Sequence, residues 1–468
     1  MLGEDVLYLP VGELGKRIRS RALSPVELTE GYLARSERLG ARLNAYATLT
    51  RELALQQARA AEREIAAGRY RGPLHGIPYA AKDLLAVKGY PTTWGARPLA
   101  QQKFDFDATV IERLKRAGAV LIGKAAMIEL AGGMGYRFAS ASLTGAAKNP
   151  WNEACWTCGS SSGSGGIVAA ALAAFAIGTE TWGSIVCPSA YCGVTGLRPT
   201  FGRVSRYGAM ALSYSMDKIG PMARTADDCA LVLSAIAAHD SKDRGSLSPA
   251  EAAFSYTAAA EKPVRPLRIG SLANAWKKVD KGVQSATETA LDLLGKNGAR
   301  VAEARLPEGP FEDAANVIIA VEGASAFAPL IESGRVAELD DPLGKIAGYV
   351  NEQISASDYL RAVRVRGVLQ KKMDELFHDF DLVAAASLPI TATPLETNLE
   401  TELSFPDPLG GIGNLCGLPA ISVPCGFSEN KPVGIQFVGH PRDDRAVVAA
   451  ARLFQQHTDW HTKRPPIS

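Results

Sequence analysis

Two serine-bearing stretches decide the fold of this chain: GSSSGSGG at residues 159–166 and TETWGSIVCPSAYCGVTGLRPT at residues 179–200. The small, apolar run IVAAALAAFAIG at residues 167–178 joins them and predicts a buried, helix-like segment. Glycines in both turns let the backbone bend sharply or approach a ligand closely. Successive N–H groups in such a turn can form an anion-binding nest. The two turns can therefore bring Ser160 and Ser184 to one place, which is a setting suited to acyl transfer.

A lysine far upstream can supply the base that a nucleophilic serine needs. Lys82 lies in HGIPYAAKDLLAVKG, residues 75–89, among apolar neighbours. Burial lowers the pKa of an ammonium group, so a buried Lys82 can be neutral and accept a proton. The alternative is a lysine that extends its charge to solvent or pairs with the adjacent Asp83.

The serine turns also have simpler interpretations, as a phosphate-binding loop or a tight turn in a core. The stretch GSSSGSGG lacks the Gly-Lys-Ser/Thr ending that places a lysine on phosphates. It also lacks the downstream acidic residue at a strand end that a dinucleotide-binding fold requires. Both phosphate-binding interpretations are therefore disfavoured.

Taken together, the motifs resemble the amidase signature family. PYAAKD around Lys82, GSSSGSGG around Ser160 and GTETWGSIVCPSAYCGVTGLRPTFGRVS around Ser184 match its three catalytic segments in order. The later stretches GPMARTADDCALVL and GLPAISVPCG also fit, so the resemblance covers nearly the whole chain. It implies a Ser–cis-Ser–Lys triad, with Ser184 as nucleophile, Ser160 as the bridging serine and Lys82 as base.

We predict one large α/β domain over residues 1–468, in which helices cover both faces of a mixed β-sheet. Patterns of strand and helix alternate from residue 71 to 125, and the apolar run 119–122 is typical of a buried strand. The expected parts are N-terminal helices at 1–70, a catalytic core at 71–235, a helical substrate-entrance region at 236–410, and a return to the sheet at 411–468.

The resemblance implies covalent hydrolysis of an amide. Neutral Lys82 takes a proton from Ser160, Ser160 takes one from Ser184, and Ser184 attacks the carbonyl carbon. The protons return through Ser160 to the leaving amine, and water then releases the acyl group.

Further residues are expected to hold the oxyanion or the substrate. Backbone N–H groups of the turn at Thr181, Trp182 and Gly183 are expected to bind the oxyanion. Met134, in the glycine-rich loop ELAGGMGYRF, is the expected acyl-pocket residue. Family members commonly have glycine where this chain has Trp182, so either its backbone geometry is ordinary or the site is rearranged. The indole then either stacks on a flat substrate group or points into the core.

The sequence alone also allows two other kinds of functional site, a histidine triad and a cysteine site. His75 lies seven residues before Lys82 and would be the base of a histidine triad, although G-x-S-x-G is absent around Ser184. Cys155 and Cys158 form a C-x-x-C match, which is typical of redox and metal sites. No second C-x-x-C or paired histidines complete a zinc site, so we expect no metal and no cofactor.

Composition indicates a globular protein without a polyanionic partner. Lys and Arg number 51 against 49 Asp and Glu, which gives a net charge of +2 and no basic excess for nucleic acid. The longest apolar run is too short to span a bilayer, and MLGEDVLYLP lacks a signal-peptide pattern. We therefore expect a cytoplasmic monomer or homodimer that acts on a small-molecule amide, ester or carbamate, with no nucleic acid and no membrane.

Two functions fit the motifs, and the first is preferred. One is a stand-alone amidohydrolase that cleaves small-molecule amides, including aryl amides, esters or carbamates (urethanes). The alternative is the glutaminase-like A subunit of a tRNA-dependent amidotransferase. Such subunits carry a YLADIYT-like segment where this chain has FPDPLGGIGNLCGLPA, which does not match it. An inactive scaffold is disfavoured because all three triad positions are present.

Overall fold

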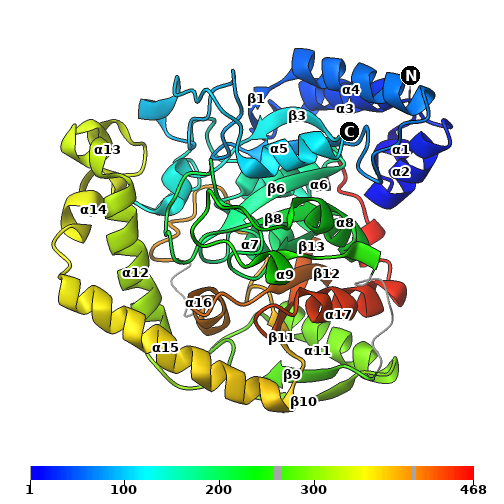
Figure 1. Ribbon diagram of the computed structural model, residues 1–468. Helices are drawn as coiled ribbons and strands as arrows, with labels where there is room; N and C mark the ends of the chain where they lie inside the picture. The colour runs from blue at the N-terminus through cyan, green and yellow to red at the C-terminus, as the bar shows by residue number, and fades with distance from the viewer. Residues whose placement is uncertain (1, 258–264, 403–406, 468) are drawn as a thin grey trace.

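One eleven-stranded sheet runs through the chain in a computed structural model that describes residues 2–257, 265–402 and 407–467 (Figure 1). In spatial order its strands are β1 (Tyr46–Leu49), β3 (Val120–Ala125), β2 (Pro78–Lys82), β6 (Phe175–Glu180), β8 (Lys218–Ala223), β7 (Thr195–Arg198), β12 (Ala420–Ser428), β13 (Lys431–Gly439), β11 (Leu382–Ala386), β9 (Arg268–Leu272) and β10 (Arg300–Ala304). Strands β4 (Lys148–Asn149) and β5 (Asn152–Trp156) form a separate pair.

Strand directions make the sheet mixed. The pairs β2–β3, β2–β6, β9–β10 and β9–β11 are parallel. The pairs β1–β3, β6–β8, β7–β8, β7–β12, β12–β13 and β11–β13 are antiparallel. Strands β2, β3 and β6 are buried at every position, as expected of strands covered on both faces. The predicted α/β fold class with a mixed sheet is confirmed.

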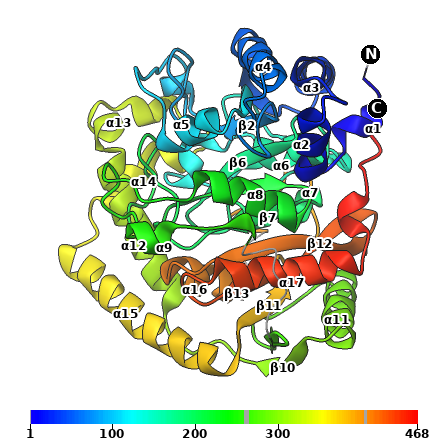
Figure 2. The same ribbon diagram turned by 45° about the vertical axis from the view of Figure 1, so that its right-hand side comes forward.

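Helices cover both faces of this sheet (Figure 2). On one face α8 packs on β7 and β8, and α17 packs on β12 and β13; α6 packs on β6 from the other side. The helices are α1 (Glu4–Leu7), α2 (Val11–Arg19), α3 (Pro25–Leu39), α4 (Arg51–Ala66), α5 (Thr109–Arg116), α6 (Ser162–Ala169), α7 (Val186–Cys192), α8 (Ala226–Ile236), α9 (Pro249–Ala252), α11 (Lys281–Lys296), α12 (Phe311–Ala326), α13 (Ala328–Glu332), α14 (Gly344–Asn351), α15 (Ala356–Asp379), α16 (Pro408–Leu415) and α17 (Asp444–Gln456).

The run at residues 167–178 differs from the predicted continuous segment. Helix α6 ends at Ala169, the chain turns through Ala171 at a φ of +52°, and β6 starts at Phe175. The run is buried throughout, so hydrophobicity alone does not distinguish a helix from a strand. The split matters for the site, because it places one serine turn before α6 and the other after β6.

The middle and end of the chain complete the same sheet. Residues 236–410 contribute β9, β10 and β11 as well as the helical arm α12–α15, drawn in yellow in Figure 1. The two termini lie close together, and the Arg464 guanidinium pairs with the Asp5 carboxylate. The finer division of the chain into four parts stays a prediction.

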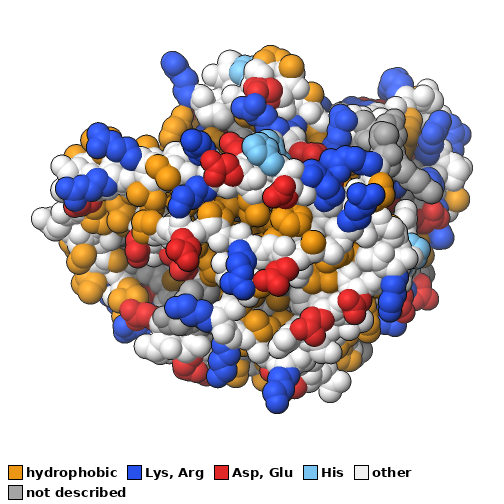
Figure 3. Space-filling model, turned by 90° about the horizontal axis from the view of Figure 1, so that it is seen from below, with side chains coloured by type: hydrophobic (Ala, Val, Ile, Leu, Met, Phe, Trp, Pro, Cys, Tyr) orange, Lys and Arg blue, Asp and Glu red, His pale blue; other side chains and the backbone are white. Residues whose placement is uncertain are grey.

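The outer surface carries charges of both signs. On the face seen in Figure 3, basic and acidic side chains are interspersed among apolar ones. Across the described ranges, none of the helices combines the length and the hydrophobicity needed to cross a membrane.

Candidate active site

Three side chains from distant parts of the sequence meet near the carboxyl ends of β2 and β6. Lys82 is the last residue of β2, Ser160 lies in the turn before α6, and Ser184 lies in the turn before α7. The Lys82 Nζ donates to the Ser160 Oγ at 2.7 Å, and the Ser160 Oγ donates to the Ser184 Oγ at 3.0 Å. All three side chains are buried. The structure thus brings the predicted residues into one hydrogen-bonded series.

Burial controls the protonation of Lys82. Loss of solvation lowers the pKa of its ammonium group to about 7, against the opposing effect of the Asp217 and Glu180 carboxylates. Neither structural alternative for this lysine holds, because its side chain is fully buried and Asp83 pairs with Lys124 at 2.9 Å. Lys82 can therefore be neutral near pH 7 and accept a proton.

The backbone of both serine turns is unusual. The Gly159–Ser160 peptide bond is cis, as the family resemblance implies. Gly183 has a φ of +79°, and a Cβ there would lie 2.7 Å from the Cys187 Sγ, so the position requires glycine. Trp182 is not among the described residues with positive φ. Of the two alternatives for Trp182, ordinary backbone geometry is the one found.

A buried carboxylate anchors the turn between β6 and α7. One oxygen of Glu180 accepts the N–H groups of Ile185 and Val186 at 2.8 and 3.0 Å. The other accepts from Arg198 at 2.6 Å and from Asn414 at 3.0 Å. Burial acts to raise the pKa of Glu180, but the Arg198 guanidinium leads the opposing effects that lower it to about 2. The ionised carboxylate therefore ties the end of β6 to the first turn of α7.

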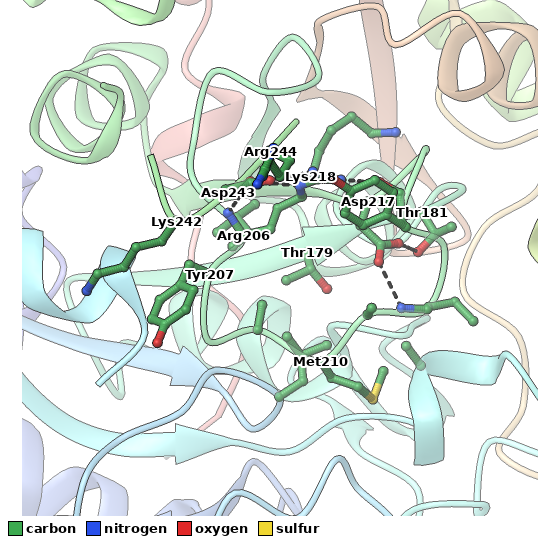
Figure 4. A pocket seen from close by; sticks show the side chains of 17 residues that line it. Thr179, Thr181, Arg206, Tyr207, Met210, Asp217, Lys218, Lys242, Asp243 and Arg244 are labelled. Carbon is green, nitrogen blue, oxygen red and sulfur yellow. Dashed lines mark hydrogen bonds and ion pairs between the residues drawn. The ribbon is translucent and has the colours of Figure 1, made fainter. Parts of the chain in front are cut away.

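A cavity of about 250 Å³ adjoins this site (Figure 4). Thr179 lies in its wall and accepts a hydrogen bond from the Lys82 Nζ at 3.0 Å through its Oγ1. Thr181 and Asp217 also line it, and the Thr181 Oγ1 donates to the Asp217 carboxylate at 2.5 Å. Sequence reasoning missed Asp217, because its motif SMDKIG carries no signal for contact with a turn 36 residues earlier.

In the glycine-rich loop, Ala131 lines the cavity, whereas Met134 and Tyr136 lie in other places. Met134 is buried against α14, where a Cβ at Gly348 would clash with its methyl group. It does not line the cavity beside Lys82. Tyr136 of the same loop is half-buried, and a Cβ at Gly159 would lie 2.5 Å from its hydroxyl oxygen. The only sequence signal for Tyr136 was an aromatic residue in a loop rich in glycine.

The Trp182 indole extends from the Ser184 turn to α16. Its Nε1 donates to the Asp407 Oδ2 at 2.9 Å. A Cβ at Gly411 would lie 3.2 Å from the indole ring, so the ring packs directly on this helix. The ring remains partly exposed, so it is neither free in solvent nor enclosed in the core.

The other candidate bases and ligands lie apart from the serines or have other partners. The His75 Nε2 lies 3.3 Å from a Glu64 oxygen, and its Nδ1 accepts the Arg71 N–H at 3.1 Å. Both ring nitrogens are thus engaged away from Ser184. Cys155 and Cys158 are free thiols. The described part of the chain contains no cluster of three or more side chains suited to a metal ion.

Fold and site together are those of an amidohydrolase, a hydrolase that acts on carbon–nitrogen bonds. The chain belongs to the amidase signature family, because a family model described as Amidase matches residues 27–448.

The similar proteins within this family carry the names of different enzymes. The chain is 37% identical, over 99% of both sequences, to the A subunit of glutamyl-tRNA(Gln) amidotransferase from Chloroflexus aggregans. Among solved structures it resembles native peptide amidase from Stenotrophomonas maltophilia, with a TM-score of 0.88, 32% identity and 98% of each chain covered. It also resembles the A subunit of the same amidotransferase from Thermotoga maritima, with a TM-score of 0.80, 27% identity and full coverage of both chains.

The prediction about partners is corrected by these relatives. The sequence led us to expect a small-molecule amide, ester or carbamate, no nucleic acid, and a monomer or homodimer. The relatives matched over 99% of the chain are named as one subunit of an enzyme for glutamyl-tRNA(Gln). The inference from charge was wrong because a net charge of +2 describes this chain alone. In an assembly, another subunit can supply the surface that binds nucleic acid.

Proposed function

We propose that this chain hydrolyses a primary carboxamide through a Ser184 acyl-enzyme, as the glutaminase-like A subunit of a tRNA-dependent amidotransferase. The observation that carries the assignment is the identity of 37% over 99% of both chains to a protein of that name. The unmatched FPDPLGGIGNLCGLPA segment weighs less than agreement along the whole sequence. Cleavage of esters or carbamates, and a cytoplasmic location, stay predictions.

The proposed chemistry uses the Lys82–Ser160 and Ser160–Ser184 contacts with donor and acceptor exchanged. Neutral Lys82 accepts a proton from Ser160 while Ser160 accepts the proton of Ser184, and the Ser184 Oγ bonds to the amide carbon. N–H groups of the turn at residues 181–184 stabilise the oxyanion. When the carbon–nitrogen bond breaks, the relay returns a proton to nitrogen and ammonia leaves. Water, deprotonated by the same relay, then hydrolyses the acyl-enzyme.

The first experiment measures ammonia release from glutamine by the wild type, Ser184→Ala and Lys82→Ala. Each protein is assayed alone and together with the remaining subunits of a glutamyl-tRNA(Gln) amidotransferase. We expect release by the wild type, and a loss of about a thousandfold or more in both variants. Ser164→Ala is the matched control, because this buried hydroxyl donates to the backbone carbonyl of Ile177 and to neither serine of the site among the described contacts. A near-wild-type rate for Lys82→Ala would remove Lys82 from the mechanism.

A second candidate is hydrolysis of peptide carboxyl-terminal amides by the chain alone. The TM-score favours it, at 0.88 for the peptide amidase against 0.80 for the amidotransferase chain. The same assay separates the two candidates when an amidated dipeptide is added. Turnover of the dipeptide amide by the isolated chain, with none of glutamine in the assembly, would favour the peptide amidase function. Glutamine turnover that rises in the assembly would favour the amidotransferase function.

A further inference from the structure

We propose that Asp407 is a positioning residue that sets the substrate selectivity of the Ser184 site by fixing the Trp182 indole. The inference rests on the second candidate under the proposed function, hydrolysis of peptide amides, and takes Ser184 as the nucleophile. The glutamine carboxamide follows a saturated chain, so it is not among the substrates that this inference favours. It concerns which amides are accepted rather than how they are cleaved.

Trp182 is close enough to Ser184 to contact a bound substrate. Cα atoms two residues apart are separated by at most about 7 Å. The backbone on both sides of the tryptophan is fixed, because Thr181 donates to Asp217 and Gly183 takes a left-handed conformation. The indole is partly exposed, so some of its surface is available to a ligand.

The far edge of the indole is fixed as well. The Asp407 Oδ2 accepts the Nε1–H at 2.9 Å, and the ring packs on Gly411 of α16. A Cβ on Gly411 would lie 3.2 Å from the indole, which is a tight contact, so a side chain there would press on the ring. The backbone of Trp182, the Nε1 edge of its indole and the side of the ring that faces Gly411 are all held in place. The indole therefore presents one defined surface to a ligand.

Asp407 is itself held in place by two helices. Its Oδ1 caps α16 by accepting the Gly410 N–H at 2.9 Å. Its own N–H donates to the Glu312 Oε1 of α12 at 2.6 Å. The two carboxylate oxygens therefore have separate roles, one in capping the helix and one in orienting the indole. Trp182→Phe therefore removes the contact with the indole and keeps the cap, whereas Asp407→Ala removes both.

A flat ring of fixed orientation favours substrates with a flat group beside the scissile amide. Aromatic rings and peptide planes can stack on an indole face, whereas a saturated chain gains only apolar contact. We therefore expect selectivity for aryl and peptide amides over saturated aliphatic amides. Loss of the indole orientation should weaken binding of the flat substrates and leave the chemical step unchanged.

The test compares kcat/KM for benzamide, an amidated dipeptide and propionamide in the wild type, Asp407→Ala, Asp407→Asn and Trp182→Phe. Asp407→Ala and Trp182→Phe should each lower the ratio of benzamide to propionamide about tenfold, mainly through KM. Asp407→Asn keeps an acceptor oxygen and should recover part of the ratio. Asp280→Ala is the matched control, because Asp280 caps α11 through the Gly282 N–H and should leave the ratio unchanged.

The possible results separate the positioning role of Asp407 from the proposed function. An unchanged ratio in both Asp407→Ala and Trp182→Phe, with turnover retained, overturns the positioning role. Trp182→Phe keeps the α16 cap, so it still tests the inference if Asp407→Ala does not fold. A wild type that hydrolyses no amide overturns the proposed function, and the selectivity proposal falls with it.

Discussion

At the scale of single residues, the protonation of Lys82 should set the pH dependence of the reaction. Burial lowers its pKa to about 7. As a base it must be neutral, so kcat/KM should rise with pH through about 7 and level off above it. One unit below the pKa only about a tenth of the lysine is neutral, so the rate at about pH 6 should be about tenfold below the plateau. The measurement is kcat/KM for one amide across the range from about pH 5.5 to about pH 9.

A second lysine titrates in the same range and supplies the control. Burial lowers the pKa of Lys218 to about 7 as well, and this side chain also lies close to Glu180 and Asp217. In Lys218→Met the rise with pH should remain, because Lys218 makes no hydrogen bond to either serine among the described contacts. If kcat/KM no longer changed with pH in Lys218→Met, the group responsible for the pH dependence would be Lys218 and not Lys82.

The sequence predicted the three side chains that meet in the structure, and it missed residues that contact the turn carrying Ser184. Lys82, Ser160 and Ser184 each lie in a local motif with a recognisable pattern. Asp217 and Asp407 act through contacts 36 and 225 residues away in the chain, for which neither carries a local signal. Long-range contacts of this kind are defined by the packed structure alone.

At the scale of elements, Glu180 joins β6, α7, β7 and α16 around the Ser184 turn. Glu180→Gln should destabilise the protein by about 3–5 kcal/mol, because it leaves the buried Arg198 without a counter-charge. The free energy of unfolding in urea measures this cost. Activity should fall as well, since the Ile185 and Val186 N–H groups lose their anionic acceptor.

An exposed glutamate provides the comparison. Glu13 pairs with Arg17 at 3.1 Å on the solvent side of α2, with side chains that are 39% and 43% exposed. Glu13→Gln should change the free energy of unfolding by less than about 1 kcal/mol and leave activity intact. If Glu180→Gln changed the free energy of unfolding and the activity as little as Glu13→Gln, the hydrogen bonds of Glu180 would not be what holds the Ser184 turn.

Elements were predicted well where a local signal was strong. Residues 120–122 of the apolar run at 119–122 form the first half of β3. The run at 167–178 was less informative, because a fully buried segment has no polar face to reveal its period.

At the scale of the whole molecule, the order of strands in space differs from their order in the chain. Strands β12 and β13 come last in the sequence but lie between β7 and β11 in the sheet. They join the half of the sheet that contains β2 and β6 to the half that contains β9 and β10. The fold class follows from alternating patterns, but this strand order does not, because strand partners are chosen by packing across hundreds of residues.

This order predicts that the return segment at 411–468 cannot be removed. A chain ending at residue 410 would expose the pairing edges of β7 and β11 and the apolar faces that α17 covers. Unpaired strand edges and exposed core promote aggregation. We expect fragment 1–410 to be insoluble when expressed alone, and coexpression with fragment 411–468 to restore a soluble complex. Solubility and circular dichroism measure both. A soluble 1–410 with a cooperative unfolding transition would show that the first part of the chain folds without the central strands.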